Sequence, residues 1–259
     1  MSINQTKVVT VEELKKSGLF INPEAYSVTP EYNNGCVVIP PDGVKFTVNA
    51  NDPYISGSCR SEVAFQRKDN SDQTSKRLIV EASFFVPTSS VPSNHPFSIL
   101  QIHERPRTID GITKWLPPAV SLVIKNGKLY LNYSGTEVLE PTTNPYVYSN
   151  LLDKDDYIVV GEGFSAVIEV VWAEYDEQCG VLLKPGSVRL NVFGDNYHYE
   201  NIMIGRAGRK GIFFKTGCYS WEMSRPDIRE AGIDVASQSI IVSEVDVETD
   251  NDEESANYE

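Results

Sequence analysis

Short runs of alternating apolar and polar residues make up most of this chain, and proline, glycine and asparagine separate them. A period of two is typical of strands that bury one face, and these runs are rich in β-branched and aromatic residues, which favour strands. The main runs cover residues 36–39, 44–48, 58–65, 77–86, 98–104, 120–133, 165–175, 187–193, 211–221 and 239–247. A helical pattern appears only at residues 11–18. The sequence therefore predicts an all-β sandwich or barrel with few short helices.

One domain accounts for the 259 residues, because β-sandwiches often reach this length. We expect it to span residues 1–248, with residues 1–18 as an N-terminal extension and residues 249–259 as a disordered acidic tail. Asn126-Gly127 is the pair typical of a two-residue type I′ turn within a hairpin. Residues 105–118 and 140–163 are rich in chain breakers, so we expect irregular loops there, and loops of this length are often functional.

The net charge of −13 argues against nucleic acid as a partner. Eight acidic residues lie in the last sixteen positions, so the rest of the chain carries only −5 and can still present a cationic surface. No apolar run approaches the roughly 20 residues of a membrane span, and the N-terminus lacks the apolar segment of a signal peptide. The sequence leaves open a cytoplasmic protein, a trimmed secreted protein and a product released by lysis, as from a phage. We expect a monomer.

The four cysteines are Cys36, Cys59, Cys179 and Cys218. They have no C-x-x-C spacing, so we expect neither a zinc site nor any other metal site. We interpret them as buried free thiols, which behave as small apolar side chains.

The run 211–221 has the most informative polar face. Alternation places Lys215 and Tyr219 on one side, together with Gly217 and Trp221. A cation and a phenol therefore stand four residues apart with only a glycine between them, which leaves the space between them open. This arrangement suits an anionic ligand from which a proton is removed.

Two earlier runs have similar polar faces. Arg60 and Glu62 share one side of the run 58–65, and Gln101 and His103 share one side of the run 98–104. For any single run, the solvent-facing side of an antiparallel sheet is the simpler explanation. Three such strands in one sheet, however, would line a single surface with complementary groups.

The chemistry that suits these groups is β-elimination on a uronic-acid polysaccharide. Removing the proton next to a carboxylate requires that the carboxylate be neutralised, which Arg60, Gln101 and His103 can do through hydrogen bonds that strengthen as charge develops. Tyr219 can serve as base or as acid, but its ordinary pKa of about 10 requires nearby cations such as Lys215 and Arg60 for use near neutrality. His103 is the alternative base.

Three other residues enter as substrate contacts. Glu62 most simply orients Arg60 by an ion pair, with a catalytic acid as the alternative. In the loop 105–118, Arg105 and Trp115 can close over a sugar, although a tryptophan packed against its own domain explains Trp115 equally well. His198 lies between two tyrosines and is interpreted as a surface residue.

Three motifs carry a family resemblance. Arg60-Ser61-Glu62, Gln101-Ile102-His103 and Phe214-Lys215-Thr216-Gly217-Cys218-Tyr219 resemble the motifs R-S/T-E-L-R, Q-I/V-H and Y-F-K-A-G-x-Y-x-Q of the alginate-lyase-type enzymes of polysaccharide lyase family 7, in the same order. The resemblance covers roughly residues 20–248. It implies a jelly-roll sandwich of the concanavalin-like type whose concave sheet holds the polymer.

The resemblance also implies roles for these residues. Arg60 and Gln101 would neutralise the carboxylate, His103 would neutralise it or act as base, Tyr219 would be the acid and often the base, and Lys215 would support the site. No metal or organic cofactor is implied. Two departures bear on the substrate: Ala64 stands where the motif has a second arginine, and Ser220-Trp221 follows Tyr219 where the motif has a residue followed by glutamine. Trp221 offers a stacking surface instead.

Other functions are weighed beside the alginate-type lyase. A glucuronan-type lyase on the same fold fits the loss of the second arginine, and a carbohydrate-binding module or adhesin would keep the surface without turnover. A β-glucanase-type hydrolase needs paired carboxylates, and Glu244, Asp246 and Glu248 alternate as such a pair would. These acids run directly into the acidic C-terminus, which favours a solvated strand.

Overall fold

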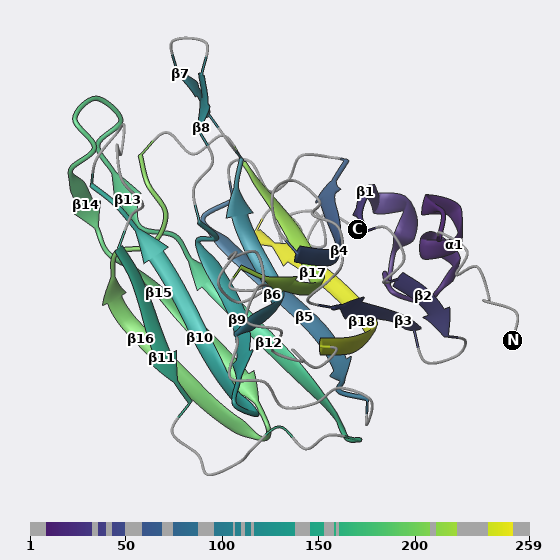
Figure 1. Cartoon of the computed structure of the whole chain (residues 1–259). Helices are drawn as coiled ribbons and strands as arrows, with labels where there is room; N and C mark the ends of the chain where they lie inside the picture. The colour runs from purple at the N-terminus through teal and green to yellow at the C-terminus, as the bar shows by residue number, and fades with distance from the viewer. Residues whose placement is uncertain are drawn as a thin grey trace, which may run out of the picture.

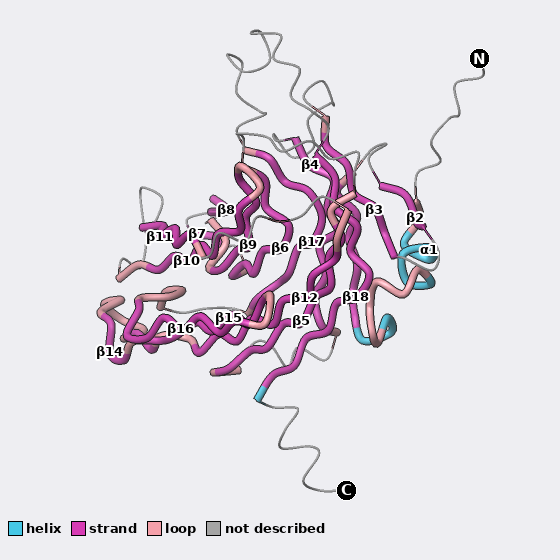
Figure 2. The backbone as a smooth tube through the Cα atoms, turned by 90° about the horizontal axis from the view of Figure 1, so that it is seen from below, coloured by secondary structure: helices cyan, strands magenta, loops and turns pink. Residues whose placement is uncertain are grey.

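The computed structural model describes residues 9–32, 36–39, 43–49, 59–68, 75–87, 96–105, 107–109, 112–114, 117–137, 146–152, 158, 161–207, 211–221 and 238–250. Two seven-stranded antiparallel sheets stack face to face (Figures 1 and 2). The first sheet has the order β1 (Tyr26–Glu31), β4 (Cys59–Arg67), β17 (Ile212–Ser220), β6 (Phe97–Glu104), β9 (Val120–Lys125), β10 (Lys128–Gly135) and β11 (Tyr146–Leu151). The second has the order β16 (Asp195–Ile202), β15 (Gly186–Val192), β12 (Gly163–Val171), β5 (Arg77–Phe85), β18 (Gln238–Thr249), β3 (Gly43–Val48) and β2 (Cys36–Ile39).

The core lies between the two sheets, where the apolar side of each alternating run is buried. Strand β5 illustrates the pattern, because Leu78, Val80 and Phe84 are buried while Glu81 points outward and is exposed. Burying an aliphatic or aromatic side chain of this size stabilises the fold by about 1.5 to 3 kcal/mol. The predicted all-β sandwich is confirmed, and period-two alternation is the feature that located its strands.

The predicted N-terminal helix and the predicted Asn126-Gly127 turn are both present. The single α-helix of the described residues, α1 (Val11–Lys16), begins with a capping box between Thr10 and Glu13 and is followed by Gly18 with φ of +80°. A short 3-10 helix, Pro23–Ala25, follows it. Asn126 and Gly127 both have positive φ values, 53° and 70°, which the type I′ turn requires.

The loop predictions were partly wrong. Residues 107–109 and 112–114 form a small ladder, β7 (Arg107–Ile109) with β8 (Ile112–Lys114), and β11 lies inside the stretch 140–163. Prolines at the ends of these stretches suggested irregular structure, but the Thr-Ile and Tyr-Val-Tyr segments between them favour strands. Strand β1 and the small strand β14 (Leu182–Lys184) were not predicted either. Its partner β13 (Glu174–Tyr175) lies at the end of the predicted run 165–175 but is a separate strand from β12.

Three of the four cysteines are buried free thiols, as expected, but Cys179 is exposed. It lies in a turn where the side chain of Asp176 accepts hydrogen bonds from the backbone of Gln178 and of Cys179. In the described part of the chain no helix is long and apolar enough to cross a membrane. Residues 1–8 and 251–259, which include most of the expected tail, lie outside the described residues.

Strand β17 contains a bulge that matters for the site. Its pairing with β6 shifts register between Thr216 and Tyr219, whereas its pairing with β4 stays regular. Gly217 lies inside this irregularity with φ of +132°, and a Cβ there would meet the carbonyl oxygen of Ser61 and lie 2.8 Å from the Cα of Glu62. Both the backbone conformation and the lack of space therefore require glycine.

We predict that Gly217→Ala lowers the free energy of unfolding by about 2 to 4 kcal/mol, because it adds overpacking against backbone atoms to the strain of a positive φ. Gly194→Ala is the matched control. Gly194 has φ of +81° but no atom within 4 Å of its Cβ position, so only about 1 kcal/mol of strain is expected. Urea unfolding of both variants measures the difference, and equal losses would show that space at Gly217 is not limiting.

Candidate active site

Three neighbouring strands, β4, β17 and β6, bring the predicted residues together on the outer face of the first sheet. Cross-strand register places Tyr219 opposite Arg60, and Lys215 opposite Gln101. His103 lies opposite Phe213, and the two rings stack with centroids 4.8 Å apart. Residues directly opposite in antiparallel strands point to the same side, so the three motifs share one surface.

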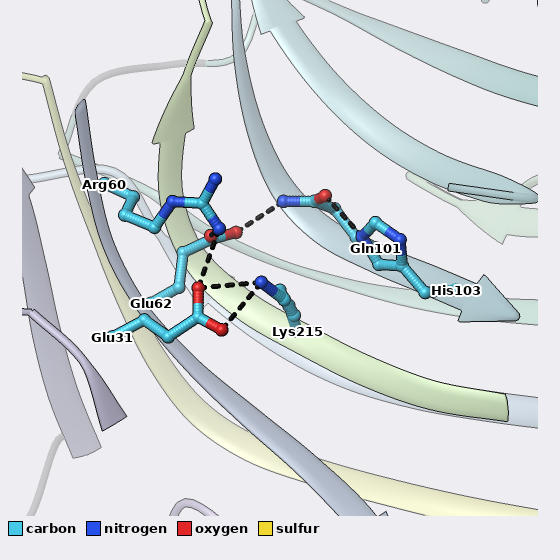
Figure 3. A network of polar contacts seen from close by, with 6 residues as sticks. All are labelled: Glu31, Arg60, Glu62, Gln101, His103 and Lys215. Carbon is cyan, nitrogen blue, oxygen red and sulfur yellow. Dashed lines mark hydrogen bonds and ion pairs between the residues drawn. The ribbon is translucent and has the colours of Figure 1, made fainter. Parts of the chain in front are cut away.

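Glu31 is the residue that sequence reasoning missed. It is the last residue of β1, and Figure 3 shows its carboxylate between Arg60 and Lys215. Nζ of Lys215 donates to both of its oxygens at 2.8 and 2.7 Å, and Nη1 of Arg60 donates to Oε2 at 2.7 Å. Burial alone would raise the pKa of Glu31, but hydrogen bonds and charges from Lys215 and Arg60 lower it below its ordinary value.

Glu62 is the most deeply buried acid of the site, with 1% of its surface exposed. It lies opposite Gly217, and its Oε1 accepts a hydrogen bond from Nε2 of Gln101, two strands away (Figure 3). Because β17 lies between β4 and β6, this hydrogen bond carries the side chain of Glu62 across β17 at the level of Gly217. The space expected to be open between Lys215 and Tyr219 is therefore occupied by the side chain of Glu62.

The environment of Glu62 disfavours its charge. Burial raises its pKa to about 7, although Lys215, Arg60 and the hydrogen bond from Gln101 act in the opposite direction and Glu31 adds to the rise. Its Oε2 is 3.7 Å from Nη1 of Arg60 and has no hydrogen-bond partner among the described residues. The expected ion pair with Arg60 is thus present but long, and Glu31 is the closer partner of the guanidinium.

A hydrogen-bonded chain connects Glu62 to His103. Because the carboxylate oxygen of Glu62 accepts, the amide nitrogen of Gln101 faces Glu62 and its carbonyl oxygen faces Nε2 of His103, 2.8 Å away. Nε2 must then carry a proton and donate it to that carbonyl. In a neutral imidazole this arrangement puts the basic lone pair on Nδ1, so Gln101 determines the tautomer of His103.

Tyr219 packs beneath a cation. The guanidinium carbon of Arg60 lies 4.7 Å from the centroid of its ring, and Trp221, which is 38% exposed, lies 6.0 Å from it ring to ring. A cation over a phenol ring is an attractive contact, and here it fixes the ring of Tyr219 beside the guanidinium. Lys215, the other cation expected to assist Tyr219, is instead held by Glu31.

Arg105 and His198 are not part of the polar network of Figure 3. Arg105 follows β6, where its backbone nitrogen donates to the carbonyl of Gly211 and its own carbonyl accepts from the side chain of Arg206. Trp115 lies outside the described residues. His198 is on β16, at the edge of the other sheet, and its Nε2 is 3.4 Å from Glu200.

The carboxylates that suggested a hydrolase lie on β18, which belongs to the second sheet. Val245 and Val247 of that strand are buried, whereas Glu244 and Glu248 are exposed on the opposite side. They therefore share no surface with Arg60. In the described residues, no group of three His, Cys, Asp or Glu side chains is placed to hold a metal ion.

A polar row extends the site across the sheet. Starting from Lys215 and Gln101, the register continues through Ser121 on β9, Asn132 on β10 and Ser149 on β11. Oδ1 of Asn132 is buried and has no hydrogen-bond partner within the described part of the chain. No sequence motif marks these residues. Only the pairing of four strands reveals that they form one line.

The comparison with family profiles matches residues 27–239 to a family described as polysaccharide lyase. The chain belongs to the polysaccharide lyase family. This range contains all three motifs, and it also contains Glu31. A search of the curated proteins found no match.

Solved structures of lyases share the fold of this polysaccharide lyase. An endo-β-1,4-glucuronan lyase from the fungus Trichoderma reesei matches 95% of this chain and 92% of its own, with a TM-score of 0.60 and 16% identity. The alginate lyase from Klebsiella pneumoniae matches 84% and 86%, with a TM-score of 0.54 and 13% identity. Alginate lyase A1-II′, a member of polysaccharide lyase family 7, matches 84% of each chain, with a TM-score of 0.50 and 15% identity. The expected jelly-roll sandwich is confirmed.

We predict that Glu62→Gln flattens the pH dependence of stability. The pKa of Glu62 rises from an ordinary 4.5 to about 7 in the folded protein, so between these values the native state holds a proton that the unfolded state has released. The free energy of unfolding therefore falls as pH rises through this window, by on the order of 3 kcal/mol for this group. Glutamine cannot titrate and should remove that slope.

Urea unfolding between about pH 5 and about pH 8 measures the effect. Glu244→Gln, which removes an exposed carboxylate from the other sheet, is the control and should leave the slope almost unchanged. An unaltered slope in Glu62→Gln would mean that Glu62 is ionised throughout this range.

Proposed function

We propose that this polysaccharide lyase cleaves a uronic-acid polymer by β-elimination on the outer face of the first sheet. The observation that carries the proposal is the placement of Arg60, Gln101, His103 and Tyr219 on one face of three adjacent strands. These groups supply what the reaction needs: donors for a carboxylate, and proton carriers beside them.

In the proposed mechanism the substrate carboxylate binds beside Arg60 and Gln101. Glu31 uses one end of the guanidinium and Glu62 uses one N–H of the Gln101 amide, so each residue keeps further donors for the substrate. Charge that develops on the carboxylate as the neighbouring proton leaves is stabilised by these preorganised donors. Because Glu31 and Glu62 hold the donors in place, little reorganisation is needed during the reaction.

The proton carriers are Tyr219 and His103. Tyr219, whose ring lies under the guanidinium of Arg60, protonates the departing glycosidic oxygen and, as the motif resemblance implies, is also a candidate for the base. His103 is the alternative base, since its neutral form has the lone pair on Nδ1 when Nε2 donates to Gln101. Both assignments predict an unsaturated uronate at the new end of the product.

The substrate is a polyuronate such as alginate, with glucuronan as the second candidate. Two observations set the site apart from the alginate-lyase motif and keep glucuronan as a candidate: Ala64 replaces an arginine of the motif, and Glu31 neutralises part of the charge of Arg60 and Lys215. The fold is also shared with a glucuronan lyase along 95% of the chain. Ser121, Asn132 and Ser149 are suited to hydrogen-bond further sugars along the same line. Such polymers are met outside cells, and we propose that the enzyme acts there.

We predict that Tyr219→Phe reduces turnover by at least about 100-fold while oligosaccharide binding changes little, because only a proton carrier is removed. The ultraviolet absorbance of the conjugated product, followed with alginate, polymannuronate, polyguluronate and glucuronan in parallel, measures both turnover and substrate choice. If the variant keeps its rate, the proton transfers belong to His103. If the wild type binds these polymers without an absorbance rise, it is a carbohydrate-binding protein.

The double variant Glu244→Gln, Glu248→Gln tests the hydrolase alternative. Both carboxylates lie on the second sheet, away from the proposed site, so lyase turnover should stay within about twofold of the wild type. Reducing-end and absorbance assays on the same samples distinguish the reactions. Loss of cleavage in this variant would assign the chemistry to β18.

A further inference from the structure

Four charged side chains of the site form one electrostatic unit. Arg60 and Lys215 carry positive charges, and Glu31 and Glu62 are the acids that face them. With both acids ionised the four charges sum to zero, and with Glu62 protonated the sum is +1. The protonation of a single buried acid therefore decides whether the site attracts an anion.

Glu31 is the fixed anion of this unit. Three charge-assisted hydrogen bonds of 2.7 to 2.8 Å from Lys215 and Arg60 hold its carboxylate, and such bonds favour the ionised form. It fills the position at which one anion contacts both cations at once. An incoming sugar carboxylate meets two cations whose charge Glu31 already offsets in part.

Glu62 is the variable member. One oxygen accepts from Gln101, whereas Oε2 is buried and has no hydrogen-bond partner among the described residues. A second anion brought near a 1% exposed carboxylate is strongly unfavourable in such a poorly solvated place. Adding a proton to Oε2 removes this repulsion.

We propose that Glu31 is a positioning residue that couples substrate binding to proton uptake: the sugar carboxylate binds as Glu62 takes one proton from solvent onto Oε2, which restores a net positive charge around Arg60 and Lys215. This inference rests on the proposed polyuronate substrate. No bond other than this O–H bond is formed in the coupling step. It precedes the elimination and is reversible.

The other titratable groups around Glu62 define the competing explanation. Lys215 and Tyr219 face it from β17, Arg60 from its own strand and Glu31 from β1, while His103 is connected to it through Gln101. Cys218, on the core side of β17, is fully buried and its raised pKa keeps it neutral. His103 is therefore the group that would take up the proton if Glu62 does not.

The test uses the Tyr219→Phe protein, in which bound substrate is not consumed. Calorimetric titration with a glucuronate trisaccharide and with an alginate trisaccharide, at about pH 8 in buffers of different ionisation enthalpy, gives the number of protons taken up. We expect close to one proton per bound trisaccharide. We also expect affinity to fall by up to about tenfold per pH unit above neutrality.

Three variants in the same background separate the groups. Glu62→Gln should abolish the uptake, because the amide that replaces the carboxylate cannot take up a proton in this pH range. Glu31→Gln should also reduce it and should tighten binding several-fold, because Glu62 can then stay ionised beside two less compensated cations. Glu31→Asp keeps the charge and should restore the uptake, which a purely structural role of residue 31 does not predict.

The outcomes are distinguishable. Binding without proton uptake, or with an affinity independent of pH, would overturn the inference while leaving the lyase proposal intact. Uptake that persists in Glu62→Gln would assign the proton to His103 and overturn it as well. If neither trisaccharide binds, the polyuronate proposal fails, and this inference fails with it. If the variants at residues 31 and 62 do not fold, the titration is repeated with His103→Asn in the Tyr219→Phe background: uptake that persists without the imidazole supports Glu62, and uptake that is lost overturns the inference.

Discussion

A carboxylate that is removed from water must be given donors or lose its charge, and this requirement orders the whole outer face of the first sheet. Glu31 satisfies it by binding Arg60 and Lys215, and Glu62 does so only partly, through Gln101. The two acids therefore hold the three donor side chains in fixed positions. Preorganisation of this kind is what a reaction with a charged intermediate needs, since donors that are already in place do not have to move.

The arrangement depends on backbone geometry as much as on side chains. Gly217 combines a positive φ with close contact to the backbone of β4, and the side chain of Glu62 crosses β17 at the same level to reach Gln101 on β6. The bulge between β17 and β6 lies at the same place. Gly217 therefore takes part in the packing against β4, in the shift of register and in the crossing of Glu62. The packing and the positive φ explain why a glycine stands between Lys215 and Tyr219.

Much of this was predictable from alternation alone. A period of two placed Arg60, Gln101, His103, Lys215 and Tyr219 on polar faces, and the motif resemblance indicated that these faces belong together. Glu31 escaped because β1 is a short strand containing Pro30, whose pattern does not distinguish it from a loop, and because its partners are 29 and 184 residues away in sequence.

The same limit applies to the row through Ser121, Asn132 and Ser149, which exists only once the register of four strands is known. The strands at 107–109, 112–114 and 146–151 were missed for a different reason, since flanking prolines outweighed the β-forming residues between them. Local composition marks where a chain can turn. It does not decide whether neighbouring strands supply partners for the segment in between.

The position of Glu31 at the end of an edge strand has a thermal consequence. Among the described strands, β1 pairs with β4 alone and stands at the edge of the first sheet. Edge elements open at a lower free energy than the centre of a sheet. Fraying of β1 would withdraw the anion that holds the guanidinium and the ammonium together while the sandwich core stays intact. On heating, the enzyme should therefore lose the arrangement of Glu31, Arg60 and Lys215, and with it activity, at a temperature below that at which the sandwich unfolds.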